Sequence, residues 1–154
     1  MQGFYAIHKY ATPTAGRPAG GVTCFLKGTM GKIEVLSKKE DTVIIRTTEA
    51  TLIALYIPPG VPIEDIVGTI TEATEQTKNE ENVILAGDFN CRTDKPNTKT
   101  DILLDILEEE GFKLANRRED PTYIAPNGTS MIDLIFYRGK SNSKKGYGRQ
   151  RQPP

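Results

Sequence analysis

A chain of 154 residues with 37% hydrophobic and 26% charged residues is long enough for one domain and too apolar to be disordered throughout. No apolar run approaches the roughly 18 residues of a membrane-spanning helix, and residues 1–10 lack the pattern of a secretory signal. The formal net charge is zero, so the total charge indicates no partner. Cys24 and Cys91 have no partner at metal-binding spacing, and we expect them to be reduced in an intracellular protein.

The basic residues are concentrated towards the C-terminus. Residues 138–154 contain six Lys or Arg and no acidic residue, whereas residues 1–137 contain all twenty Asp and Glu. The last residues are also rich in Ser, Gly and Gln and almost free of apolar side chains. We therefore expect a folded domain over residues 1–138 and a disordered basic tail over residues 139–154.

Short apolar and β-branched segments predict a series of strands in the first part of the chain. We expect these strands over residues 3–10, 21–27, 32–36, 42–47 and 51–57. The segment of residues 11–21 contains two prolines and three glycines, which indicates a loop. Pro58-Pro59-Gly60 ends the last of these strands, because proline has no backbone donor.

The period of the apolar residues then changes to that of a helix. The spacing i, i+3, i+4 and i+7 is occupied by Ile63, Ile66, Val67 and Ile70. This spacing predicts an amphipathic helix that ends near residue 79. We expect a buried strand over residues 82–86, a second helix over residues 100–110, and strands over residues 112–115 and 131–137. The order predicts a layered α/β domain in which helices cover sheets.

The sequence Gly87-Asp88-Phe89-Asn90 directly follows a predicted buried strand. If the strand geometry persists through Phe89, Asp88 and Asn90 point the same way while Phe89 packs into the core. A carboxylate beside a carboxamide at the C-terminal end of a buried strand is a plausible phosphate site. There the carboxylate can activate a water or hold a divalent metal. A simple Asp/Asn turn is the alternative interpretation.

Two other predicted strands carry candidate polar groups. Tyr56 ends the strand over residues 51–57, where its phenol can bind a phosphate or simply pack. In the last strand, Asp133 shares one face with Ile135 and Tyr137. A carboxylate among apolar residues is costly unless it is paired, so we expect Asp133 to have a His, an Arg or backbone donors as a partner.

Five segments occur in the order typical of the endonuclease/exonuclease/phosphatase superfamily. They are residues 17–22 (RPAGGV), 54–59 (ALYIPP), 84–90 (ILAGDFN), 121–123 (PTY) and 130–135 (SMIDLI). Over roughly residues 4–138 the sequence resembles the endonuclease domains of non-LTR retrotransposons of the jockey-like kind. The resemblance implies a partial four-layer α/β sandwich, in which two mixed β-sheets are flanked by helices and the first and last elements of the family fold are lacking.

The resemblance also implies a role for each matching residue. Tyr56 is similar to the family's active-site tyrosine, and Asp88 to the aspartate that activates the attacking water. Asn90 is similar to the asparagine that holds the scissile phosphate, and Asp133 to the aspartate that orients a catalytic histidine.

The substrate, the metal and the location follow from the same resemblance. Thr122 and Ser130 match substrate-binding positions near the DNA-facing rim. The implied chemistry is phosphodiester hydrolysis with Mg²⁺, for which Asp88 is a candidate ligand in an incomplete site. The implied partner is DNA rather than a membrane, and the nucleus is one candidate location inside the cell. The sequence does not indicate an oligomeric state.

The chain departs from the family pattern at three groups. The family's first asparagine, its metal-binding glutamate and the Asp-His pair near its end have no counterpart, and the single histidine, His8, lies at the wrong end of the chain. Because losing one member of a catalytic set commonly costs about 10³ in rate, we expect a truncated and catalytically inactive endonuclease domain. Three alternatives stay open: an active enzyme whose missing groups come from another chain, a nucleic-acid-binding module that uses the retained groove and the basic tail, and a phosphatase-like member of the superfamily.

Overall fold

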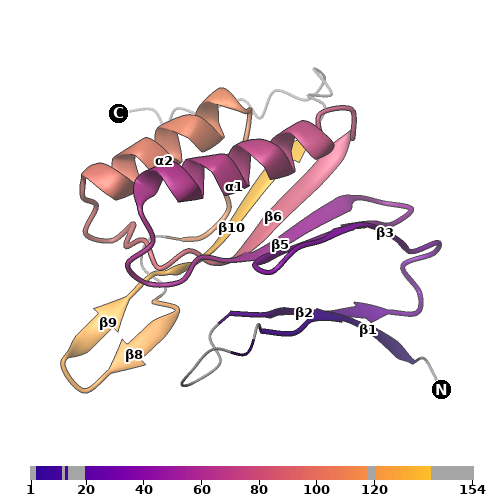
Figure 1. Ribbon diagram of the computed structural model, residues 1–154, viewed down its shortest axis with the longest axis horizontal. Helices are drawn as coiled ribbons and strands as arrows, with labels where there is room; N and C mark the ends of the chain where they lie inside the picture. Colours follow the sequence, from indigo (N-terminus) through magenta and orange to yellow (C-terminus); the bar gives the residue numbers. More distant parts are fainter. Residues whose placement is uncertain (1–2, 12, 14–19, 118–120, 140–154) are drawn as a thin grey trace, which may run out of the picture.

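The computed structural model describes residues 3–11, 13, 20–117 and 121–139 (Figure 1). Apart from Gly139, the predicted basic tail lies outside the described residues. In the described part of the chain, no helix is both long enough and apolar enough to cross a bilayer.

Among the described residues, six strands form the main sheet in the order β3-β4-β5-β6-β10-β7. They are β3 (Glu34–Lys38), β4 (Thr42–Arg46), β5 (Thr51–Tyr56), β6 (Asn82–Asp88), β10 (Asp133–Gly139) and β7 (Lys113–Leu114). β5 and β6 are parallel, and the other neighbouring strands are antiparallel. This mixed sheet confirms the predicted α/β class.

Two helices in the described residues, α1 (Ile63–Gln76) and α2 (Thr98–Glu109), cover one face of the main sheet (Figure 1). Alternate residues of the central strands are buried against them: Ile53, Leu55, Val83, Leu85, Leu134 and Phe136. The helices contribute Ile66, Ile70, Leu103 and Leu107 to the same core. The predicted apolar stripe of α1 is therefore confirmed, and burial of this stripe holds the helix on the sheet.

A second, small sheet packs against the other face of the main sheet. It consists of the antiparallel strands β1 (Phe4–Lys9) and β2 (Val22–Lys27). Cys24 and Leu26 of β2 and Val43 and Ile45 of β4 are buried between the two sheets. The described residues thus form three layers, which are the helices, the main sheet and the small sheet, in a partial form of the predicted sandwich (Figure 1).

Several predicted boundaries are shifted, among them those of β3 and α1. The strand expected over residues 32–36 is β3, because a bulge between Val35 and Ser37 lets pairing continue to Lys38. The helix α1 ends at Gln76 rather than near residue 79. Its end is closed by Thr77, whose hydroxyl donates to the backbone carbonyls at the end of the helix, with contacts of 3.1 and 3.2 Å.

A hairpin that the sequence analysis did not predict projects from the body of the structure (Figure 1). Its strands are β8 (Tyr123–Ala125) and β9 (Gly128–Ser130). Each strand is too short to show an alternation of apolar residues. The turn signal Pro126-Asn127-Gly128 is the feature of the sequence that marks it.

Arg138, near the end of β10, binds the C-terminal ends of both helices. Its guanidinium donates to the carbonyl of Thr77 at 2.8 Å and to that of Glu110 at 3.2 Å, which are the C-terminal cap residues of α1 and α2. It also lies 4.7 Å from the centre of the Phe112 ring. A cation at this place satisfies helix-end carbonyls that have no partner within their own helices.

We expect Arg138→Met to lower the free energy of unfolding by about 2 kcal/mol, because it removes a charged donor from two carbonyls but keeps the apolar stem. Urea unfolding followed by circular dichroism would measure the loss. Lys78→Met is the control: Lys78 is exposed and pairs with Glu75, so its loss should cost less than about 0.5 kcal/mol. Equal losses in the two variants would show that the hydrogen bonds of Arg138 contribute nothing specific.

Candidate active site

The register of the main sheet places three of the predicted site residues in one row. Tyr56 at the end of β5 is paired with Asp88 at the end of β6, and Asp88 is paired with Asp133 at the start of β10. Side chains of directly paired residues lie on the same face, with Cβ atoms about 5 Å apart. Because Leu55 and Leu134 point towards the helices, the row lies on the opposite face of the sheet.

The backbones of β5 and β6 approach closely just before this row. Leu55 is paired with Gly87, and a Cβ added to Gly87 would lie 1.7 Å from the carbonyl oxygen of Leu55. Glycine is therefore required at this position for the two strands to remain paired up to Tyr56 and Asp88.

The chain turns directly after Asp88. The condition that strand geometry persists through Phe89 is not met, because β6 ends at Asp88 and Asn90 has a φ of +47°. Oδ1 of Asp88 accepts a hydrogen bond of 2.9 Å from the Asn90 N–H, which is the Asp/Asn turn of the alternative interpretation. Phe89 is buried as predicted, and its ring centre lies 5.5 Å from that of Phe136.

The side chain of Asn90 ties this turn to the end of β5. Its Nδ2 donates to the carbonyl of Ile57 at 2.8 Å, and the Ile57 N–H donates to the carbonyl of Asp88 at 2.8 Å. Within the described residues, the second Nδ2 hydrogen and the Oδ1 atom of Asn90 have no hydrogen-bond partner. Because Asn90 is partly exposed, these two groups are accessible to water or to a ligand.

Asp133 is exposed, so the expectation that its carboxylate needs a His, an Arg or backbone donors as a partner is wrong. Water solvates its carboxylate, and the cost of burying a charge does not arise. Its backbone is held instead. The Oγ1 of Thr122 accepts from the N–H groups of Ile132 and Asp133 at 3.1 and 3.0 Å. The side chain of Asn116 accepts from the Ile135 N–H at 2.6 Å and donates to the Asp133 carbonyl at 3.1 Å.

Thr122 and Ser130 lie together at the base of the hairpin. The Thr122 N–H donates to the Ser130 carbonyl at 3.0 Å. Thr122 is exposed, and its hydroxyl oxygen is used to hold the start of β10. Ser130 is buried.

The sequence analysis missed a clamp formed by Arg92 and Asp94. Arg92 donates to Asp94 at 2.6 Å and to the carbonyl of Thr129 at 2.8 Å. Asp94 accepts from the Met131 N–H at 3.3 Å. The hydrogen bond from Arg92 lowers the pKa of Asp94 to about 2, so the pair stays ionised. The clamp joins the loop after Asn90 to β9 and β10, and only the opposite charges two residues apart indicate it in the sequence.

The pKa of Asp88 is raised above its ordinary value. Burial is the main cause, the N–H of Asn90 acts in the opposite direction, and the negative charge of Asp133 adds to the rise. A carboxylate with a raised pKa is a stronger base, which is a property of catalytic groups.

The oxygen atoms of this site fit a metal ion only in part. Within the described ranges, no group of three or more His, Cys, Asp or Glu could hold a metal. Mg²⁺ is commonly held by one or two carboxylates together with water and substrate phosphates. The carboxylates of Asp88 and Asp133 and the Oδ1 of Asn90 are compatible with such a shared site, and not with one built from protein ligands throughout.

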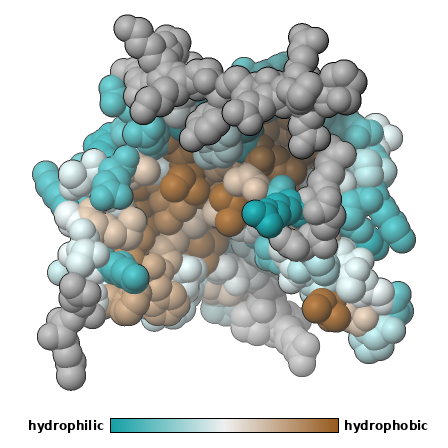
Figure 2. All heavy atoms as spheres, turned by 180° about the vertical axis from the view of Figure 1, so that it is seen from behind, coloured by the Kyte–Doolittle hydropathy of each residue, from teal (hydrophilic) through white to brown (hydrophobic). Residues whose placement is uncertain are grey.

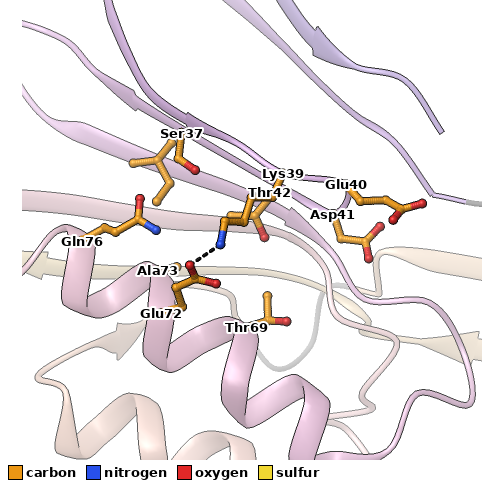
Figure 3. Close-up of a pocket in the computed structure, with 10 residues that line it drawn as sticks. Ser37, Lys39, Glu40, Asp41, Thr42, Thr69, Glu72, Ala73 and Gln76 are labelled. Atoms are coloured by element: carbon orange, nitrogen blue, oxygen red, sulfur yellow. Dashed lines mark hydrogen bonds and ion pairs between the residues drawn. The ribbon is translucent and has the colours of Figure 1, made fainter. Parts of the chain in front are cut away.

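A cavity of about 140 Å³ lies on the helix-covered side of the sheet, between the β3–β4 turn and α1 (Figure 3). Lys39 and Glu72 form an ion pair across it. The carbonyl of Asp41, which also lines the cavity, accepts from the Tyr56 N–H at 2.9 Å. The cavity is therefore linked to the row through the backbone of Tyr56, but it contains none of the row's side chains.

Comparison with known proteins supports the family resemblance of the sequence. A family model described as endonuclease-reverse transcriptase matches residues 50–152. A search of curated proteins finds no match.

Solved structures with a similar fold include nucleases. The endonuclease domain of TRAS1, a telomere-specific non-LTR retrotransposon, has a TM-score of 0.71 and 18% identity, over 85% of this chain and 64% of that one. The 3′ phosphatase NExo from Neisseria, bound to a product DNA hairpin, has a TM-score of 0.66 and 11% identity, over 88% and 67%. An AP endonuclease from Archaeoglobus fulgidus has a TM-score of 0.60 and 11% identity, over 88% and 66%. At these identities the likeness shows the fold, and this chain spans 64% of the length of the TRAS1 domain.

We expect Gly87→Ala to destabilise the protein by more than about 3 kcal/mol, because the new methyl group would overlap the Leu55 carbonyl and separate β5 from β6. Gly68→Ala is the matched control. Gly68 lies within α1 with nothing near its added Cβ, so alanine should stabilise the helix by about 0.5–1 kcal/mol. Thermal unfolding of both variants would test the difference, and a mild effect at Gly87 would contradict the close approach.

We expect Asp88→Asn to stabilise the fold at neutral pH. The raised pKa means that ionised Asp88 costs the folded state free energy, and asparagine removes the charge while keeping an acceptor for the Asn90 N–H. The gain should shrink as the pH falls through the raised pKa and vanish below the ordinary value of 3.8. Urea unfolding at several pH values would measure it, with Asp105→Asn on the exposed face of α2 as control. A pH-independent gain would assign the effect to something other than the charge.

Proposed function

Because the chain belongs to the endonuclease-reverse transcriptase family, we propose that the row of Tyr56, Asp88 and Asp133 is the phosphodiester-binding part of a DNA endonuclease site. The observation that carries this proposal is the register that aligns the three residues where β5 and β6 end. The carboxyl ends of parallel strands are the edge at which α/β sheets bind ligands. The product DNA bound by NExo, which has a similar fold, supports DNA as the ligand.

Each residue has a role that its chemistry allows. Asp88, with its raised pKa, accepts a proton from the attacking water. The phenol of Tyr56 and the second Nδ2 hydrogen of Asn90 donate to phosphate oxygens. Asp133 faces the same ligand from β10, and Thr122 is a positioning residue that holds the backbone of Asp133. Buried Ser130 supports Thr122 through its carbonyl.

The charges of the row imply that DNA binding there depends on a divalent cation. Two neighbouring carboxylates repel a phosphodiester. Asp88, Asp133 and Asn90 are the residues that would hold Mg²⁺ together with the phosphate. When bound, the ion neutralises negative charge on the phosphate oxygens.

We propose further that this chain by itself hydrolyses DNA slowly or not at all. The only histidine of the sequence, His8, lies in β1, and its ring centre is 5.1 Å from that of Tyr10 rather than at the row. No imidazole is therefore available to complete the acid–base chemistry. The absence of one member of a catalytic set commonly costs about 10³ in rate.

Fluorescence anisotropy with a labelled DNA duplex, in Ca²⁺, Mg²⁺ or EDTA, tests the binding proposal. We expect binding that needs a divalent cation and weakens at least about tenfold in Asp88→Asn and in Asp133→Asn, but not in Asp105→Asn. Plasmid nicking in Mg²⁺ should remain at background for every protein.

A second candidate function, DNA binding through the basic segment of residues 140–154, predicts a different result. It rests on the six Lys and Arg of residues 138–154, and it predicts cation-independent, salt-sensitive binding that disappears when residues 140–154 are deleted. That result would overturn the role of the row. Nicking that is lost in Asp88→Asn would instead support the row and overturn the proposed inactivity.

A further inference from the structure

The face of β10 that carries Asp133 is uncovered in the part of the chain that the structure describes. The small sheet lies over β4 and β5, with β1 in contact with β4 and β2 in contact with β5. Ile135 and Tyr137, which share the face of Asp133, expose 47% and 48% of their surface. Figure 2 shows apolar surface gathered in the middle of the face seen from behind. Packing therefore does not hold the Asp133 side chain in place.

The backbone of Asp133, in contrast, is held firmly. Among the described residues, the side chains that hydrogen-bond to Asp133 contact only its backbone. Thr122 accepts from its N–H at 3.0 Å, and Asn116 donates to its carbonyl at 3.1 Å. Because aspartate has a short side chain with few rotamers, the position of the carboxylate follows from the position of this backbone.

Asn116 takes the place of a neighbouring strand at the start of β10. The pairing of β7 with β10 covers only two residues, but the next N–H, that of Ala115, still donates to the Ile135 carbonyl at 2.8 Å. Asn116 follows, and its Oδ1 accepts from the Ile135 N–H at 2.6 Å while its Nδ2 donates to the Asp133 carbonyl. One carboxamide thus brings both a donor and an acceptor to the strand edge, as a paired strand does.

The two hydrogen bonds of Asn116 lie on either side of Leu134. The Leu134 side chain is fully buried against the helices. Its burial fixes one face of the strand, and Asn116 fixes the edge, so the backbone cannot rotate about the strand axis without losing one of these contacts. Asp133, the residue before Leu134, is thereby kept directed to the same face as Asp88, with which it is paired.

A shared cation requires this restraint. Ligand oxygens lie about 2.0–2.6 Å from Mg²⁺ or Ca²⁺, so two carboxylates that share one ion have oxygens within about 5 Å of each other. Two negative charges repel each other at such a separation. A strand end that could move would let the carboxylates separate, and the cation would then lose one of its two charged ligands.

We propose that Asn116 is a positioning residue of the candidate active site, whose carboxamide holds Asp133 where it can share a divalent cation with Asp88. This role rests on the proposed function, because Asp88 and Asp133 belong to the same row. It makes the cation affinity of the row depend on a side chain that contacts neither the cation nor the DNA.

The Ca²⁺ concentration at which a labelled DNA duplex binds half of the full-length chain, followed by fluorescence anisotropy, tests this role. We expect Asn116→Ala, which removes both hydrogen bonds, to raise this midpoint at least about tenfold. Asn116→Asp keeps the acceptor for the Ile135 N–H but places a carboxylate oxygen against the Asp133 carbonyl. Its added negative charge alone would lower the midpoint, whereas displacement of Asp133 would raise it, and we expect a rise.

Two controls separate positioning from stability. Arg138→Met alters the other end of the same strand, where Arg138 binds the helix ends, so it should destabilise the fold and leave the Ca²⁺ midpoint unchanged. Asn79→Ala removes the carboxamide of an exposed residue after α1 and should change neither property. Circular dichroism would verify that each variant is folded, and Asn116→Asp, which keeps one hydrogen bond, serves if Asn116→Ala does not fold.

The outcomes distinguish the role of Asn116 from the proposed function. A parent chain that does not bind the duplex in Ca²⁺, or whose binding Asp88→Asn leaves unchanged, would overturn the proposed function and this role with it. A parent that binds as proposed, with the same midpoint in Asn116→Ala, would overturn the role of Asn116 alone. An equal rise in Arg138→Met would assign the effect to lost stability, and a lowered midpoint in Asn116→Asp would assign it to charge.

Discussion

The close approach of Gly87 to the carbonyl of Leu55 is the contact on which the candidate site depends. It lets two parallel strands remain paired to their last residues, so that Tyr56 and Asp88 end side by side. The turn after Asp88 depends on the same contact, because the Asn90 side chain can reach the end of β5 only when the strand ends are near. A backbone contact without any side chain thus sets the positions of a phenol, a carboxylate and a carboxamide.

The uncovered face of β6 and β10 affects both the electrostatics and the packing of the candidate site. Asp133 is hydrated for the same reason that Ile135 is exposed, since nothing among the described residues covers this face of β10. Asp88 is half-buried beside it, and burial already raises its pKa. An apolar cover over β6 and β10 would remove more water from Asp88 and raise that pKa further. The basicity of Asp88 therefore depends on what covers the exposed apolar face of β6 and β10.

The sequence predicted the structural features that depend on a local pattern of residues. It did not predict the features that depend on contacts between segments far apart in the chain. The spacing of Ile63, Ile66 and Ile70 identified α1, because a helix buries one stripe. The sequence left strand geometry and an Asp/Asn turn both open after Asp88, and the hydrogen bond from the Asn90 N–H to the Asp88 side chain decides for the turn. The exposure of Asp133 was misjudged because an alternating strand shows which residues share a face, but not whether that face is covered.

The candidate site residues were predicted one by one and not as an arrangement. Resemblance to a family indicated Tyr56, Asp88 and Asp133, but their alignment in one row depends on register between strands far apart in the sequence. The support from Asn116 and Thr122 escaped notice because ordinary polar residues in loops carry no pattern. Their partners are backbone groups of β10, which only the folded chain places within reach.

The position of β10 sets the order in which this domain can be assembled. It is the last described strand in the sequence, yet it lies between β6 and β7. Before it is synthesised, β6 has an unpaired edge, Leu134 and Phe136 are missing from the core, and Arg138 cannot join the two helices. A nascent chain on the ribosome therefore carries an open sheet until β10 emerges. Folding then awaits long-range pairing, which is slow and leaves the unfinished edge accessible to chaperones and proteases.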